Sequence, residues 1–245
     1  MTLFLSYAHP DDESFFTAGV ARRCADLGIP VVLCCATRGQ QGSAGNPPLV
    51  SREELPARRE AELREAAAIL GIGDLHFLPY EDRRLAEAPP DEIRASLVGL
   101  LRRNRPEIVV TFDPNGGNLH PDHVAISRFT SDAVTAASDA RWHPDLGAPH
   151  RVPRLLWAGQ VLPWDETDPA RLASRPGVDF LIDVRPYRDL KRRALEAHRT
   201  QHQSIGRVFL DRPDRDAILS WETFRLATGE ALEMVPADDI FAGLR

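Results

Sequence analysis

Short apolar runs alternate with helical patterns along most of this chain, and this alternation limits the folds that it can adopt. The runs span residues 3–7, 30–36, 75–78, 107–112, 154–157 and 180–184. The helical patterns span residues 14–27, 52–70, 90–103, 123–137 and 188–201. A short, continuous apolar run is typical of a strand covered on both faces, as in parallel sheets.

Parallel strands joined by helices require right-handed crossovers, and repeated crossovers build a doubly wound sheet. We therefore predict a three-layer, Rossmann-like α/β fold with a mainly parallel central sheet. A chain of 245 residues suits a single domain over residues 1–245. Loop-rich additions are expected around residues 142–178, and the C-terminal segment 205–245 has no pattern that assigns it to a helix or strand.

Composition and charge narrow the range of partners. The net charge of −6 disfavours a nucleic-acid or anionic-membrane surface. Cys24, Cys34 and Cys35 are too few and too irregularly spaced for a disulfide framework or a cysteine-rich zinc site, so we expect core residues. The chain starts directly in a strand and has no apolar run of ~18 residues, which predicts a cytoplasmic protein. The oligomeric state, a homo-oligomer included, is left open.

The hexapeptide AHPDDE at residues 8–13 directly follows the first apolar run. In a doubly wound sheet, ligand sites lie at the carboxyl ends of strands near a change in strand order. One imidazole and two adjacent carboxylates at such a place can divide the work of a hydrolytic site. Two of them can hold a cation while the third stays free as a base, because a catalytic zinc needs only about three protein ligands.

A second motif, HPDH, follows the fourth apolar run and ends at His123. Together His9, Asp12 and His123 complete a set of three metal ligands. Asp11 is not needed as a ligand and can accept the proton of an attacking water. His120 can stabilise a developing oxyanion or supply a proton to a leaving amine. The two motifs therefore provide every group that a metal-assisted amide hydrolysis requires.

Each motif taken alone also suits an ordinary turn. His-Pro and Asp-Asp pairs are common in turns, and Asp12 or Asp122 could simply cap the helix that follows it. Two motifs at two strand ends, with Asp113 and Asn115 in the second loop, favour one shared site.

The motifs resemble those of the LmbE-like, or PIG-L, family of zinc-dependent N-deacetylases. AHPDDE, Thr37-Arg38-Gly39 and HPDH followed by x-Ala125 match in order and separation across most of the chain. Further matches are Arg59-x-x-Glu62-Leu63, Leu70-Gly71, Asp82, and Lys191 followed by His198-x-x-Gln201. The resemblance implies that His9, Asp12 and His123 bind zinc, that Asp11 is the general base, and that His120 stabilises the tetrahedral intermediate as a charged imidazole.

The resemblance also implies that Arg59 contacts substrate hydroxyls and that Asp82 lies near the sugar pocket. Exposed ion pairing in a charged helix is the simpler explanation of Arg59. Glu13 is expected to orient the metal loop, as outer carboxylates often do. Two positions depart from the family pattern: Gln40 stands where a glutamate is usual, and Thr200 replaces a serine.

We therefore predict a metal-dependent hydrolase that removes the N-acetyl group from a small molecule containing N-acetylglucosamine. Zn²⁺ is the expected cofactor, although such ligands also accept iron, cobalt or manganese. The expected partner is the small N-acetylated amino sugar, with no nucleic acid and no membrane. The alternatives are an amidase of amino-sugar thiol conjugates and a metal-stabilised sugar-binding protein without turnover. The uncommitted Asp11 disfavours the second alternative, because binding alone needs no base.

Overall fold

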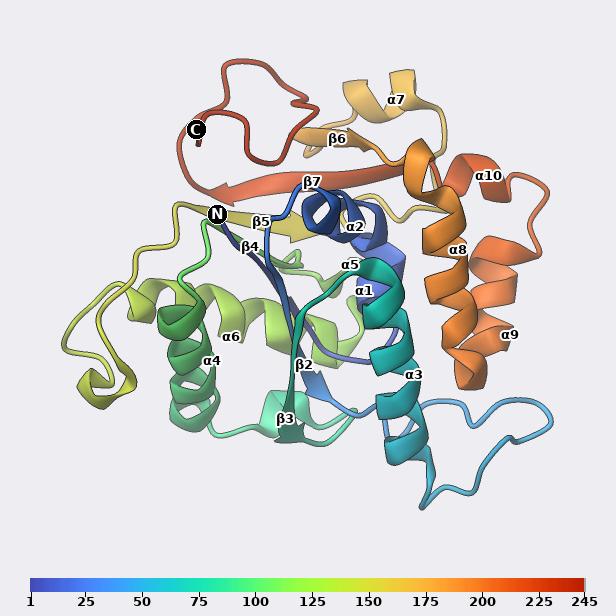
Figure 1. Ribbon diagram of the computed structural model, residues 1–245, viewed down its shortest axis with the longest axis horizontal. Helices are drawn as coiled ribbons and strands as arrows, with labels where there is room; N and C mark the ends of the chain where they lie inside the picture. Colours follow the sequence, from blue (N-terminus) through green and yellow to red (C-terminus); the bar gives the residue numbers. More distant parts are fainter. Residues whose placement is uncertain (245) are drawn as a thin grey trace.

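The computed structural model describes residues 1–244, which form one seven-stranded sheet in the order β3-β2-β1-β4-β5-β7-β6 (Figure 1). The strands are β1 Leu3–Tyr7, β2 Val31–Thr37, β3 Asp74–Tyr80, β4 Ile108–Phe112, β5 Arg154–Ala158, β6 Phe180–Asp183 and β7 Trp221–Thr228. Neighbouring strands from β3 to β5 are parallel, whereas β7 is antiparallel to both β5 and β6. The strand order changes direction at β1, between β2 and β4.

Helices cover both faces of the sheet and complete the three layers (Figure 1). The longer helices are α2 Ala18–Asp26, α3 Leu55–Leu70, α4 Pro90–Asn104, α6 Pro121–Ala137 and α8 Arg188–Ala197. Helices α4 and α6 pack together on one face, and α3 packs with α8 on the other. The shorter helices are α1 Asp12–Phe16, α5 Gly116–Leu119, α7 Pro169–Ser174, α9 His202–Ile205 and α10 Arg215–Ile218. The predicted α/β fold with a mainly parallel sheet is confirmed.

The central strands are buried along their whole length, which explains their continuous apolar sequences. Every residue of β1, β2 and β4 is buried. All three cysteines are buried and unpaired, as expected for core residues. A sheet covered on both faces leaves only the strand ends open to solvent, so polar chemistry concentrates there.

Two predicted helices end earlier than their patterns suggested, and in the first a distant contact stabilises the break. The pattern over residues 14–27 divides at Thr17 into α1 and α2. The Glu222 carboxylate accepts hydrogen bonds from the backbone N–H groups of Gly19 and Val20, which caps α2 from another part of the chain. Helix α8 ends at Ala197, and a 3₁₀ turn over Arg199–Gln201 follows it.

The C-terminal segment, which the sequence pattern did not assign, supplies β7. This strand inserts between β5 and β6 and makes the sheet mixed. Buried Arg154 on β5 donates to the carbonyl oxygens of Ile240 (2.6 Å) and Ala242 (2.8 Å), so the chain beyond β7 is also tied to the sheet. Such a strand is hard to predict because its pairing is entirely non-local.

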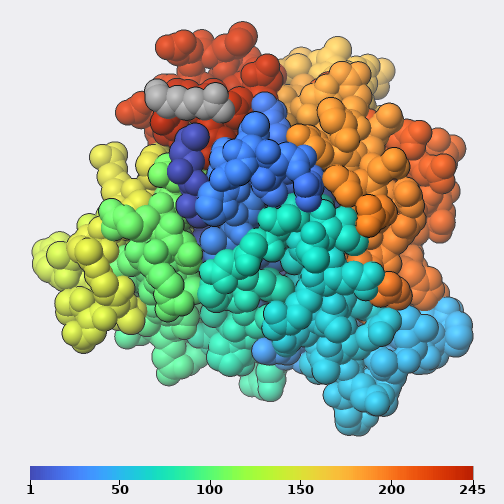
Figure 2. Space-filling view, viewed as in Figure 1, coloured from blue at the N-terminus to red at the C-terminus, as the bar shows by residue number. Residues whose placement is uncertain are grey.

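The surface view places α3 (teal) beside α8 (orange) on one side of the molecule (Figure 2). The segment after β2, residues 38–54, projects at the edge next to α3 (Figure 2). Within residues 1–244, none of the helices combines the length and apolar character needed to cross a bilayer.

Candidate active site

A cavity of about 230 Å³ opens beside the carboxyl ends of β1 and β4, where the strand order changes direction. Doubly wound sheets bind ligands at this place. The structure brings all seven residues predicted from the sequence to its walls: His9, Asp11, Asp12, Arg59, Asp82, His120 and His123. Two separate loops, one after β1 and one after β4, therefore contribute to a single site.

Two imidazole rings face each other inside this cavity. His9 donates from Nε2 to the Asp122 carboxylate (3.1 Å), with an Asp82 oxygen 3.2 Å away. His123 donates from Nδ1 to the Gly116 carbonyl oxygen (3.0 Å). These contacts place a proton on the far nitrogen of each ring. The nitrogens that remain, His9 Nδ1 and His123 Nε2, lie 3.2 Å apart, so that a second proton on His9 is donated to His123.

Asp12 completes the group, which we call the ligand trio: His9, Asp12 and His123. Asp12 Oδ1 lies 3.4 Å from His123 Nε2, and Asp12 Oδ2 lies 3.8 Å from His9 Nδ1. Oδ2 also accepts from the backbone N–H groups of Ala8 (3.1 Å) and His9 (2.8 Å), which holds the carboxylate in place. Separations of this size suit three ligands of one ion with bonds of ~2 Å.

The electrostatics of the ligand trio also suit a cation. Burial lowers the pKa of His9, but the hydrogen bonds to Asp122 and Asp82 outweigh burial and raise the pKa to about 10. Burial raises the pKa of Asp12, and the neighbouring His123 and His9 outweigh that effect and lower it to about 2. A metal ion at this place would displace the second proton of His9, since metals and protons compete for the same lone pairs.

Asp122 is a site residue that the sequence did not reveal as such. Its side chain is fully buried and accepts from the backbone N–H groups of Arg83 (2.5 Å) and Leu85 (3.1 Å), as well as from His9. It therefore orients the His9 ring and joins the β3–α4 connection to the site. Helix capping, the simpler interpretation, is not its role, because His120 is the N-cap of α6.

Neither does Asp12 cap a helix. The N-cap of α1 is Asp11, whose side chain makes no capping hydrogen bond. Asp11 has a backbone φ of 125°, in the left-handed region that non-glycine residues rarely adopt. Burial raises the pKa of Asp11 to about 6, although the nearby Arg59 charge lowers it. A carboxylate with a pKa near neutrality is well suited to accept a proton.

His120 stands beside the ligand trio, with its ring centre 4.8 Å from that of His9 and 4.9 Å from that of His123. Its Nδ1 accepts from the Asp122 N–H (3.2 Å), so the ring carries its proton on Nε2. Burial lowers the pKa of His120, and the neighbouring histidines lower it further. Both features favour the neutral ring rather than the charged imidazole that the family resemblance implies. The nitrogens of His9, His120 and His123 also lie close enough to share an ion.

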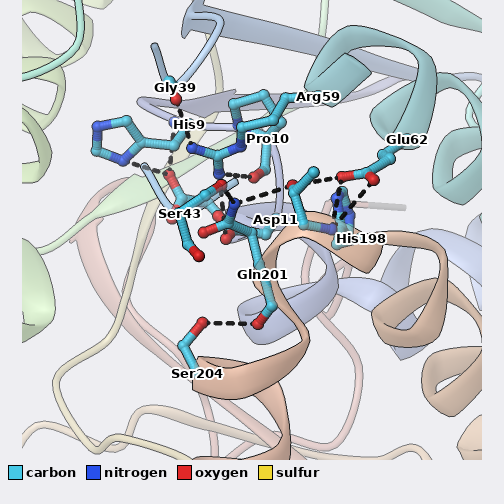
Figure 3. Close-up of polar contacts among 12 residues, drawn as sticks. His9, Pro10, Asp11, Gly39, Ser43, Arg59, Glu62, His198, Gln201 and Ser204 are labelled. Carbon is cyan, nitrogen blue, oxygen red and sulfur yellow. Dashed lines mark hydrogen bonds and ion pairs between the residues drawn. The ribbon is translucent and has the colours of Figure 1, made fainter. Parts of the chain in front are cut away.

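Arg59 lies on α3 and is 3% exposed, so it is not the surface residue that simple ion pairing would require. Its guanidinium donates to the carbonyl oxygens of Gly39 (2.9 Å) and Pro10 (2.5 Å) and to Asp11 Oδ2 (3.3 Å) (Figure 3). A side chain at Gly39 would collide with this guanidinium. Arg59 therefore supports the turn that carries Asp11 as well as lining the cavity.

Asp82 and Gln40 lie together at the end of β3. The Asp82 carboxylate accepts from the Gln41 N–H (3.0 Å) and contacts His9. The Gln40 side chain accepts from the Asp82 N–H (3.2 Å) and donates to the Tyr80 carbonyl oxygen (3.3 Å). A carboxylate at position 40 could not make the second contact, so glutamine here has a structural role of its own.

Comparisons with known proteins identify the family of this chain. The family model described as PIG-L, GlcNAc-PI de-N-acetylase, matches residues 4–134. The chain belongs to the PIG-L family. Family membership and the deacetylase class, both predicted from the sequence, are thereby confirmed.

Individual relatives carry more specific names. A 1D-myo-inositol 2-acetamido-2-deoxy-alpha-D-glucopyranoside deacetylase of Rhodococcus jostii is 33% identical, covering 99% of this chain and 98% of that protein. A probable N-acetyl-alpha-D-glucosaminyl L-malate deacetylase 2 of Bacillus anthracis is 38% identical over 54% of this chain and 58% of that protein.

Solved structures share the PIG-L fold of this chain. A conserved protein from Thermus thermophilus superposes with a TM-score of 0.72 at 27% identity, covering 98% of this chain and 99% of that one. The N,N'-diacetylchitobiose deacetylase from Pyrococcus horikoshii also gives 0.72, at 21% identity over 92% and 83% of the two chains. The second likeness concerns the fold alone.

Proposed function

We propose that this protein is a zinc-dependent deacetylase that releases acetate from a small molecule containing N-acetylglucosamine. The observation that carries the proposal is the convergence of His9 Nδ1 and His123 Nε2, 3.2 Å apart, next to the Asp12 carboxylate. In the metal-free protein one proton lies between the two nitrogens, whereas one divalent ion can accept a lone pair from each nitrogen and from the carboxylate. When bound, the ion supplies Lewis-acid activation of the acetamide carbonyl and of the attacking water.

Asp11 accepts the proton of the attacking water. Its Oδ2 faces Arg59, which leaves Oδ1 for this transfer. His120 donates from Nε2 to the oxygen on which negative charge develops. As the carbon–nitrogen bond breaks, Asp11 returns its proton to the departing amine, so the products are acetate and a free amino sugar.

The walls of the cavity suit a sugar ring. Phe15 and Trp164 form an apolar wall, and Asp82, Arg83 and Asn118 supply polar groups. Phe15 and Trp164 pack edge to face with ring centres 6.3 Å apart. Sugar rings combine an apolar face with polar hydroxyls, so such a cavity offers complementary contacts to both.

Within this cavity, we assign Arg59 and Asp82 to contacts with sugar hydroxyls, in addition to their contacts within the protein. The likeness to the inositol-glycoside deacetylase extends over 99% of the chain and supports a cyclic polyol as the second half of the substrate. The exposed Arg83 at the cavity wall favours a second candidate, an aglycone with a carboxylate such as malate.

Acetate release tests the proposal. Metal-free protein, prepared with a chelator, is supplied with zinc and with either the N-acetylglucosaminyl inositol or the N-acetylglucosaminyl malate. Zinc-dependent acetate from the inositol compound is the expected result. Faster release from the malate compound would support the second candidate. Cleavage of amino-sugar thiol conjugates without acetate release would instead identify an amidase, and zinc binding without any turnover would contradict the enzymatic proposal.

A further inference from the structure

The strained backbone of Asp11 must be stabilised by contacts with other residues. Its φ of 125° lies in the region where a side chain is strained, and such conformations persist only where the surroundings hold them. Arg59 holds the residue from one side, through the Pro10 carbonyl oxygen and Asp11 Oδ2. The Asp11 N–H points to the other side, where it donates to Glu13 Oε2 (3.1 Å).

Glu13 in turn depends on a histidine from far along the chain. Its Oε1 accepts from Ser14 Oγ (2.5 Å) and from His198 Nε2 (2.8 Å). Glu13 and His198 are each about 1% exposed, and neither lines the cavity. A buried carboxylate is stable only when it is paired and hydrogen-bonded, so His198 determines whether Glu13 can stay in position.

Helix α3 holds both supports of Asp11, which are Arg59 and the Glu13–His198 pair. It carries Arg59 directly, and its Glu62 accepts from the Thr200 N–H (3.1 Å) and hydroxyl (2.7 Å), two residues after His198. The close-up shows Arg59, Asp11 and His198 in one cluster (Figure 3). The hydroxyl shared by serine and threonine is therefore what position 200 requires.

We propose that His198 is a positioning residue for the hydrolysis: acting through Glu13, it holds the Asp11 backbone so that the Asp11 carboxylate faces the cavity rather than the metal. His198 itself touches neither substrate nor ion. This inference rests on the proposed function of Asp11 as the base, but the hydrogen bond to the Asp11 N–H can be measured without activity.

The test uses full-length His198→Ala, with His198→Phe to fill the same space without a donor in case the alanine variant does not fold. Both should lower kcat by ~10 to 100-fold with KM and zinc affinity close to wild type, the size of effect usual for outer-sphere partners. His198→Gln, whose amide can donate to Glu13, should restore most of kcat. Added imidazole should partly rescue His198→Ala.

A matched control is His150→Ala, because His150 is also buried but donates to the Pro106 carbonyl oxygen away from the cavity. It should lose stability and keep kcat. Amide hydrogen exchange of Asp11 supplies a readout that is independent of activity: exchange should accelerate in His198→Ala and stay slow in His198→Gln. Unchanged kcat together with unchanged Asp11 exchange in His198→Ala would overturn the inference. Inactive wild type with faster exchange in the variant would contradict the proposed function alone.

Discussion

The ligand trio and the Lys191–Glu222 pair are both buried groups of charges, but they are satisfied in different ways. Lys191, the only lysine of the chain, lies 2.8 Å from Glu222 with both side chains at most 1% exposed. The two Glu222 oxygens also accept from backbone N–H groups at the start of α2. Each carboxylate oxygen thus has a protein donor, so this pair is complete without a ligand.

The ligand trio, by contrast, still has ligand atoms available for an ion. The outer nitrogens of its two histidines have protein acceptors, yet the inner nitrogens face each other and a carboxylate. The two inner nitrogens share one proton, which a metal ion can replace because metals and protons compete for the same lone pairs. Burial and charge alone therefore do not identify a site. What marks the site is the gathering of three potential metal ligands around a single exchangeable proton.

The largest expected effect is the loss of the Lys191–Glu222 pair. Lys191→Met leaves the Glu222 carboxylate buried without its cation, which should cost ~3–5 kcal/mol of stability. Urea unfolding measures this loss. Zinc binding per folded molecule should be unchanged. A double variant, Lys191→Met with Glu222→Gln, should recover part of the stability; equal losses in the single and double variants would show that the pair is not the cause.

Asp11→Asn tests the proposed base beside the ligand trio. Asparagine keeps the shape of the side chain but cannot accept the proton of water, so kcat should fall by ~10² or more. Metal analysis of the same preparation should show zinc at the wild-type level, because Asp11 is outside the ligand trio. Wild-type turnover in this variant would remove Asp11 from the chemistry.

The site could be predicted from the sequence because its residues follow two strand ends that any doubly wound sheet brings together. His9 and Asp12 lie in the first motif and His123 lies in the second. The role of Asp122 could not be predicted, because it depends on backbone N–H groups that arrive from the β3–α4 connection. His198 likewise acts through a contact across 185 positions of the chain.

The same difference between local patterns and long-range contacts determines which strands could be predicted. Strands such as β1 and β4 were predicted almost to the residue, because burial on both faces gives a continuous apolar run. Strand β7 was not predicted, since its position between β5 and β6 depends on antiparallel partners remote in sequence. The break at Thr17 depends on Glu222 in the same way.

Zinc should stabilise the folded protein through the ligand trio, and the Lys191–Glu222 pair should not contribute to this effect. A ligand that binds only the folded state adds ~2.7 kcal/mol at a free concentration 100 times its Kd. Zinc should therefore raise the Tm of metal-free wild type, have no such effect on Asp12→Asn, and raise the Tm of Lys191→Met as it does in wild type. An equal rise in Asp12→Asn would place the ion elsewhere.

The smallest expected effect is a pH dependence of protein stability that arises from His198. Burial lowers the pKa of His198, but Glu13 outweighs burial and raises it above the ordinary value of ~6.5. A raised pKa in the folded state stabilises the protein fully below ~6.5, and this contribution is lost as the pH rises through the folded-state pKa. The stability difference between wild type and His198→Gln should therefore be larger at pH ~6 than at pH ~9. Equal stability differences at the two pH values would exclude a charged His198.

Calorimetric titration of metal-free protein with zinc measures directly whether the ligand trio binds the ion. Wild type should bind one equivalent and release protons, because the ion displaces the second proton of His9. His123→Ala should lose this binding, while His150→Ala, a buried histidine outside the site, should keep it. Absence of zinc binding by wild type, or binding of equal affinity by His123→Ala, would contradict the account.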